Sequence, residues 1–215
     1  MNAMPIPEPP MEEGTQLPLD ALSLIFAKVG VDVLMGAGLV CRFWLHAARV
    51  PDVWRTLHME MEDNKALRSE TTNILRALAK VAVNRSAGQL EAFAGYSFVN
   101  NDLLMHIAER SPSLKSLRLN NCWFITDDVF EKVIRNSHLS ELRSLELVNI
   151  NIGNKGLMAL LDNAPHLDSL YLWNCFKIDD DNALREKCLR IKNLTLGWDP
   201  YDDDMFQEPD LLCLN

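Results

Sequence analysis

The second half of the chain repeats one short apolar pattern, and this repeat limits the possible folds more than any other feature. Each copy reads Leu-x-x-Leu-x-Leu or a close variant, and the copies begin at Leu90, Leu114, Leu142, Leu167 and Ile191. Successive starts are 24, 28, 25 and 24 residues apart, and the copy at Leu90 is the weakest. A period in the twenties indicates a solenoid, in which repeated units stack and share one core.

The pattern within each copy predicts how one unit folds. In Leu-x-Leu the side chains alternate between the two faces of a strand, so the leucines fill the interior and the residues between them face outward. The segments between copies have helical apolar spacing, for example at Val129, Phe130 and Val133. This period and pattern are typical of leucine-rich repeats. We therefore expect an α/β fold over residues 90–198, with parallel strands on the concave face and helices on the convex face.

Polar and sulfur-containing residues recur just after the predicted strands. We expect three asparagines to satisfy backbone groups in the turns: Asn121, Asn149 and Asn174. Cys122 and Cys175 follow two of them, and we interpret both as small buried hydrophobic residues rather than metal or redox groups. Asp127 and Asp179 come next and are interpreted as helix caps rather than as an acid–base pair.

Residues 17–54 contain three apolar helical patterns, which is more apolar surface than so small a unit can bury alone. The first pattern is expected to end at Gly30, and the third to run from about Gly38 to Arg49. One interpretation is a helical subdomain whose apolar residues only pack inward. The other is that this segment also meets the repeats, a second protein, or both.

Three motifs in this segment favour a second protein. Leu17-Pro18 opens it, Val40-Cys41-Arg42-x-Trp44 follows, and Pro51-x-Val53-Trp54-Arg55 closes it. Over residues 15–56 this arrangement resembles an F-box without any gap, and together with the repeats it is similar to the short F-box/leucine-rich-repeat proteins of plants. The resemblance implies binding to a Skp-family adaptor, which links an F-box to a cullin and so to a ubiquitin ligase. The residues expected to bind the adaptor are Leu17, Pro18, Leu22, Ile25, Phe26, Leu34, Leu39, Val40, Cys41 and Trp44.

Three further segments complete the predicted organisation. Residues 1–14 are rich in proline and glutamate and are expected to form a disordered leader. Residues 57–89 are expected to hold a connecting strand at Leu57–Met59, an amphipathic helix and a loop at Asn84–Gly88, together forming an irregular capping repeat. Residues 199–215 form an acidic tail, expected to be solvated.

The composition excludes several classes of partner. The chain has 21 Lys and Arg against 30 Asp and Glu, a net charge of −9, and no basic run, so nucleic acid is not expected to bind. No apolar run reaches the ~18 residues that a membrane span requires, so no membrane association is expected. Five cysteines without a Cys-x-x-Cys pair indicate a reducing compartment, the cytosol or the nucleus.

The sequence offers no catalytic residues. Its five histidines are scattered, and it has neither a His-Glu-x-x-His motif nor a Gly-x-Ser-x-Gly motif. The paired Cys and His ligands of a zinc module are missing, so no metal and no cofactor are expected. Cys41 lies inside the F-box-like motif and is interpreted as a packed thiol.

We expect the chain to bind a protein substrate through the outward residues of the predicted strands. The candidates are Arg118, Asn120, Glu146, Tyr171 and Trp173. Two of these expectations have alternatives: Arg118 and Glu146 could pair with each other, and the two aromatic rings could cover an edge of the sheet. The expected function is that of a substrate receptor which promotes ubiquitination and proteasomal degradation of an unknown target. The alternatives are a repeat scaffold that acts without a cullin and, with least support, an enzyme with an unrecognised site.

Overall fold

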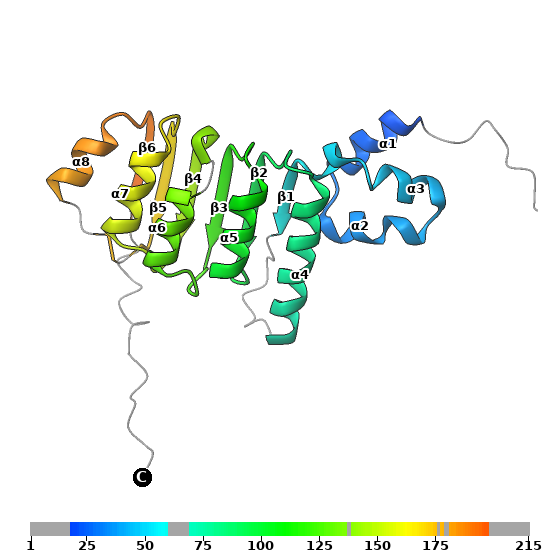
Figure 1. Ribbon diagram of the computed structural model, residues 1–215, viewed down its shortest axis with the longest axis horizontal. Helices are drawn as coiled ribbons and strands as arrows, with labels where there is room; N and C mark the ends of the chain where they lie inside the picture. Colours follow the sequence, from blue (N-terminus) through cyan, green and yellow to red (C-terminus); the bar gives the residue numbers. More distant parts are fainter. Residues whose placement is uncertain (1–17, 60–68, 137–138, 176, 179–180, 198–215) are drawn as a thin grey trace, which may run out of the picture.

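The computed structural model describes residues 18–59, 69–136, 139–175, 177–178 and 181–197. Its centre is one sheet of six parallel strands, whose order in space is their order in the chain (Figure 1). The strands are β1 Thr56–Met59, β2 Ala92–Tyr96, β3 Ser116–Asn120, β4 Ser144–Val148, β5 Ser169–Trp173 and β6 Asn193–Gly197. Each strand pairs only with its sequence neighbours, as in a solenoid, so the predicted parallel repeats are confirmed.

Leucines at equivalent positions fix the register of the sheet. Leu117, Leu145 and Leu170 are Cα partners on neighbouring strands, and the leucines two positions later are partners as well. All six of these side chains are buried. A slip of one residue would turn them all to the opposite face, so their burial selects this pairing.

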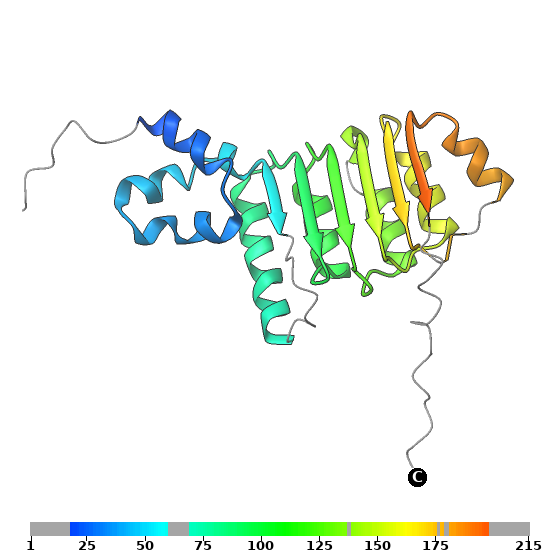
Figure 2. The same cartoon turned by 180° about the vertical axis from the view of Figure 1, so that it is seen from behind.

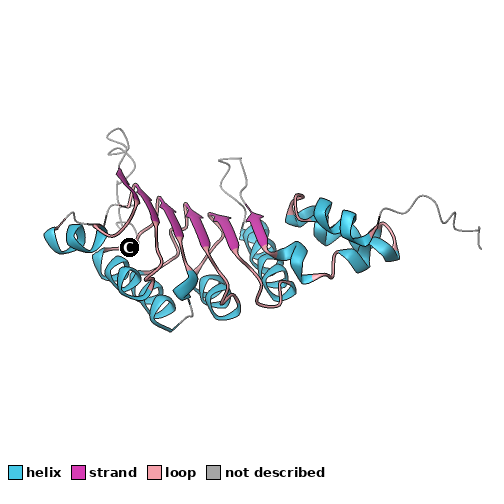
Figure 3. Cartoon of the chain, turned by 90° about the horizontal axis from the view of Figure 1, so that it is seen from above, coloured by secondary structure: helices cyan, strands magenta, loops and turns pink. Residues whose placement is uncertain are grey.

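One helix lies between each pair of successive strands, and these helices cover a single face of the sheet (Figures 1 and 3). The other face carries the outward residues between the leucines, and we call it the strand face. The helices are α4 Ser69–Arg85, α5 Asn101–Arg110, α6 Asp127–Asn136, α7 Asn154–Asn163 and α8 Asn182–Cys188, with a 3-10 turn η3 at Leu139–Glu141.

The loop expected at residues 84–88 begins later than predicted. Helix α4 continues through Arg85, because Val83 and Ser86 are buried and the Ser86 hydroxyl donates to the Val83 carbonyl at 2.7 Å. The turn itself follows at Ala87 and Gly88, whose φ angles are 50° and 85°. Positive φ favours glycine, which explains Gly88 at this position.

Residues 18–54 form a separate cluster of short helices, the N-terminal helical unit, at one end of the sheet (Figures 1 and 2). Its elements are α1 Leu19–Phe26, α2 Val31–Gly36, η1 Ala37–Leu39, α3 Arg42–Ala47 and η2 Pro51–Trp54. The first helix thus ends at Phe26, before the predicted Gly30. The third begins at Arg42, after the predicted Gly38, because Cys41 is extended (φ −163°) and its sulfur accepts the Trp44 N–H at 3.4 Å as an N-cap.

The N-terminal helical unit shares one hydrophobic core with the repeats. Trp54 is fully buried where the two meet, and its indole N–H donates to the Ala48 carbonyl at 2.8 Å. Arg85 of α4 lies over the Trp54 ring, 5.1 Å from its centroid, and also donates to the Met35 sulfur at 3.5 Å. The unit therefore closes the first end of the solenoid.

The asparagines after the strands join neighbouring turns. Asn121, Asn149 and Asn174 all have positive φ, and each backbone N–H donates to a carbonyl of the next repeat at 2.9–3.0 Å. The Asn149 amide also donates to the Asn121 side chain at 2.6 Å, and Asn121 in turn donates to the Tyr96 hydroxyl at 2.5 Å. The expected role in satisfying turn backbone groups is confirmed, and the side chains also link adjacent repeats.

Asp127 is a helix cap, but for the following helix rather than its own. Its Oδ1 accepts the N–H groups of Gly153 and Gly156 at 3.1 Å each, at the start of α7. Asn101 similarly accepts the Thr126 N–H at 3.0 Å, just before α6. Capping therefore runs from one repeat to the next. Asp179, the other predicted cap, lies outside the described residues.

Candidate protein-interaction surfaces

Three residues predicted to bind the adaptor are part of the core instead. Leu22, Phe26 and Leu34 are at most 2% exposed, so a partner cannot reach them in this arrangement. They fall at positions where the helices of the unit face one another, and burying them is what allows so small a unit to fold. Trp44 is half-buried, with its ring packed edge-to-face on Phe26 at a centroid distance of 5.2 Å.

The other predicted adaptor residues are accessible where the structure describes them. Leu39 is 92% exposed, Val40 is 62% exposed and Ile25 is 45% exposed. Pro18 and Cys41 are also exposed. Leu17 lies outside the described residues.

Two exposed apolar residues of the same unit were missed by the sequence analysis. Leu24 on α1 is 68% exposed, and Val33 on α2 is 45% exposed. A signal for Leu24 was present, because it falls off the stripe that Leu22 and Phe26 define at a spacing of four residues. With them, large apolar side chains reach solvent from α1, α2 and the segment between η1 and α3.

On the strand face, two candidate substrate residues bind each other. Arg118 Nε lies 2.8 Å from Glu146 Oε2 on the adjacent strand, which confirms the predicted pairing. Asn120, two residues beyond Arg118, is half-buried, and its side-chain oxygen has no hydrogen-bond partner within the described part of the chain. The ion pair therefore holds the centre of this face, beside an amide oxygen that can still accept a hydrogen bond.

Tyr171 and Trp173 form an aromatic pair on β5. Their ring planes differ by 16°, and their centroids are 6.3 Å apart. The Trp173 ring extends over Gly197 of the neighbouring strand β6, where an added Cβ would lie 2.2 Å from the ring atom Cζ3. The predicted alternative, that an aromatic ring covers part of the edge strand, therefore describes Trp173, and Gly197 makes room for it.

Charged residues just before the strands form ion pairs along one edge of the sheet. Glu91 pairs with both Arg55 at 3.2 Å and Lys115 at 3.1 Å. Lys192 pairs with Asp168 at 2.8 Å, and this hydrogen bond holds the Asp168 pKa below its ordinary value of 3.8. These pairs border the strand face on the side where the strands begin.

The cysteines of the repeats do not have nucleophilic chemistry. Burial raises the pKa of the Cys122 thiol to about 12 and that of Cys175 to about 11, so both stay protonated at neutral pH. Among the described residues, no three His, Cys, Asp or Glu side chains gather closely enough to hold a metal ion. Within that same part of the chain, no helix has the length and apolar character needed to span a bilayer.

Comparison with known proteins assigns the family. A family model of the leucine-rich repeats of FBD-associated F-box protein At5g56370 matches residues 75–208, more than half of the chain. The chain belongs to the plant F-box/leucine-rich-repeat family. Among its relatives in Arabidopsis thaliana, F-box/LRR-repeat protein 23 is 27% identical over 95% of this chain, and F-box protein SKIP19 is 28% identical over 92% of it.

The relatives of this F-box/leucine-rich-repeat protein differ in length. The chain spans 58% of the length of F-box/LRR-repeat protein 23 and 85% of that of SKIP19. A chain from the crystal structure of the Rad7 and Elc1 complex in yeast is 20% identical, with a TM-score of 0.48, over 84% of this chain and 46% of that one. This structural likeness is too distant to bear on function.

Proposed function

We propose that the chain is the substrate-recognition subunit of an SCF-type ubiquitin ligase, with the N-terminal helical unit acting as its F-box. The observation that carries the proposal is the exposure of large apolar side chains on a unit that buries its remaining ones. Leu39 and Val40 are 92% and 62% exposed, while Leu22 and Phe26 of the same unit are each 1% exposed. Apolar residues left in water beside a formed core are typical of a docking surface.

Family membership supports this proposal from a second direction. The alignment with F-box protein SKIP19 covers 92% of this chain, so it includes most of the N-terminal helical unit as well as the repeats. We infer that the partner is a Skp-family adaptor, which in turn binds a cullin. A standard protein interface of about 1,600 Å² is within reach of a unit this size.

The substrate would bind the strand face, around the Arg118–Glu146 ion pair and the Tyr171–Trp173 aromatic pair. The chain then needs no catalytic group of its own, because holding a substrate lysine near a loaded ubiquitin conjugate raises its effective concentration. The consequence would be ubiquitination and degradation of the bound protein, in the cytosol or the nucleus.

The N-terminal helical unit also caps the repeats, and this affects the choice of experiment. Trp54 and Leu57 are fully buried where the unit meets β1. Deleting residues 1–55 would uncover Leu57 and the first repeat, so the truncated chain is expected to unfold whether or not the unit binds an adaptor. Substitutions of exposed residues separate docking from capping.

Co-purification with a Skp-family adaptor tests the proposal. The natural chain should retain the adaptor, and the variant Leu39→Asp plus Val40→Asp should lose it, because charges would enter an apolar interface. Ile74→Asp is a matched control, since Ile74 on α4 is 60% exposed but lies outside the N-terminal helical unit. Equal adaptor retention by all three proteins, or none by any, would overturn the proposal.

The second candidate is a leucine-rich-repeat scaffold that binds proteins without a cullin complex. The observation that favours it is the shared core, because a unit that only capped the repeats would be buried against them in the same way. This scaffold predicts that the purified chain is folded and binds protein partners while ignoring every Skp-family adaptor.

A further inference from the structure

The end of the solenoid formed by β6 and α8 is open and exposes side chains that earlier repeats bury. Leu194 and Leu196 are 39% and 40% exposed, although the sequence pattern predicts that they fill the interior. Leu170 and Leu172, which hold the same positions one strand earlier, are 0% and 3% exposed. The prediction is wrong for β6 because no further repeat packs on this strand within the described residues.

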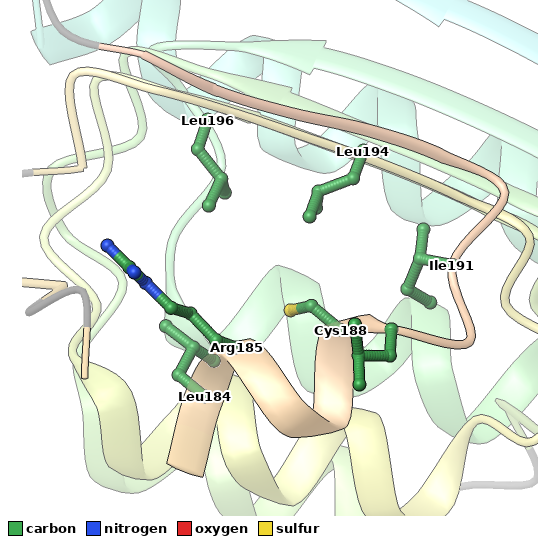
Figure 4. Close-up of a pocket in the computed structure, with 7 residues that line it drawn as sticks. Leu184, Arg185, Cys188, Ile191, Leu194 and Leu196 are labelled. Atoms are coloured by element: carbon green, nitrogen blue, oxygen red, sulfur yellow. The ribbon is translucent and has the colours of Figure 1, made fainter. Parts of the chain in front are cut away.

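A hollow of about 430 Å³ lies between β6 and α8. Figure 4 shows Leu194 and Leu196 pointing into it from the strand, and the Cys188 sulfur reaching it from the helix. The lining is apolar except for Arg185, and neighbouring Leu189 is 84% exposed. A solenoid normally covers its terminal core with a capping segment, so this end calls for a cover.

Residues 198–215, which lie outside the described part of the chain, follow Gly197 directly and have the composition of such a cover. They include six acidic residues and no Lys or Arg, which complements Arg185 at the hollow. Their large apolar residues are Trp198, Met205, Phe206, Leu211, Leu212 and Leu214. The family match also continues to residue 208, beyond the last strand.

The spacing of two of these residues matches that of earlier repeats. Phe206 comes 13 residues after Asn193, the first residue of β6, and buried Leu157 comes 13 residues after Ser144, the first residue of β4. By the same measure, Leu212 is 19 residues from its strand start, as buried Cys188 is from the start of β5. Both residues fall where earlier repeats place buried side chains of the helical layer.

We propose that residues 198–215 cover the open end of the solenoid, with Phe206 and Leu212 packed against Leu194 and Leu196. The segment is tethered to β6, so its effective concentration at the hollow is in the millimolar range expected for a short linker. This inference does not depend on adaptor binding, which involves the opposite end of the molecule.

Hydrogen exchange of the β6 amides in the full chain tests this inference. In the variant Phe206→Asp plus Leu212→Asp, the amides of Leu194 and Leu196 should exchange about tenfold faster than in the natural chain, because the cover opens more often. The control Gln207→Asp plus Asn215→Asp adds the same two charges to the same segment without removing an apolar side chain. It should leave the exchange unchanged.

Equal exchange in all three proteins would overturn the proposal. So would protection of β6 that disappears on dilution, because a second copy of the chain would then be the cover. Should the amides of β5 also exchange faster in the double variant, its fold has changed, and a photocrosslinker in place of Phe206 in the otherwise natural chain decides. An intramolecular crosslink to residues 189–196 is the expected result, and a crosslink elsewhere or to another molecule refutes it.

Discussion

Gly197 lies directly beneath the indole ring of Trp173, so close that a Cβ would come within 2.2 Å of the ring. Gly197→Ala is therefore expected to displace the ring from its place beside Tyr171 and to destabilise the fold by about 1–3 kcal/mol, the usual cost of overpacking. The indole N–H resonance of Trp173 reports the displacement, and urea unfolding reports the stability.

Gly36→Ala is the matched control for this substitution. Nothing lies within 4 Å of a Cβ at Gly36, and the residue has helical φ and ψ. Alanine there should stabilise the protein by about 0.5–1 kcal/mol, because glycine costs more backbone entropy in a helix. If both variants behave alike, the contact between Trp173 and Gly197 does not constrain the aromatic pair.

Asp127 accepts two backbone N–H groups at the start of the next helix, and its loss should be costly. Asp127→Ala is expected to reduce the free energy of unfolding by about 1–2 kcal/mol, as removal of a helix cap does. Asp127→Asn should cost less, because the amide oxygen can still accept. The comparison is Asp128→Ala, which removes only an exposed ion pair with Lys155 and should cost less than about 0.5 kcal/mol.

The ion pair on the strand face is expected to contribute little to stability. Arg118 and Glu146 are 47% and 29% exposed, so a double-mutant cycle with Arg118→Gln and Glu146→Gln should give a coupling of about 0.5 kcal/mol. A coupling several times larger would indicate that the pair is a structural element rather than part of a binding surface.

The Asp168–Lys192 pair makes a prediction about pH. Lys192 lowers the pKa of Asp168 in the folded protein, so the pair stabilises the fold above the ordinary pKa of 3.8. That contribution is lost as the pH falls through the lower, folded-state pKa. Titration by NMR should show Asp168 ionising below 3.8 in the natural chain and closer to 3.8 in Lys192→Gln. An Asp168 pKa that does not respond to this substitution contradicts the assignment.

The repeats were predictable because their signal is redundant. Leu117, Leu145 and Leu170 repeat the same alternation, and their register in the sheet follows from burying all of them on one face. Asp127 shows what a single repeat conceals, since its partners lie 26 and 29 residues further along the chain. Aligning the first residues of α5, α6 and α7, which are Asn101, Asp127 and Asn154, would have exposed a recurring polar position.

The candidate surfaces were less predictable, because exposure depends on neighbours that the sequence pattern does not specify. Leu22 and Ile25 lie on one short helix, yet the first is buried against the unit and the second reaches solvent. Leu194 fits the leucine pattern as well as Leu170 does, but it lies on the last described strand, where no further repeat buries it. Residue type therefore identified the segments, whereas three-dimensional packing decided which side chains a partner can touch.

Calorimetric titration of the full chain with a purified Skp-family adaptor tests the central claim most directly. The account predicts a saturable complex for the natural chain and for Ile74→Asp. It predicts that Leu39→Asp plus Val40→Asp weakens binding by about 100-fold, the effect of removing interface hot spots, with unchanged thermal stability. A natural chain that stays folded and binds no adaptor, or a double variant that binds as tightly as the natural chain, would contradict it.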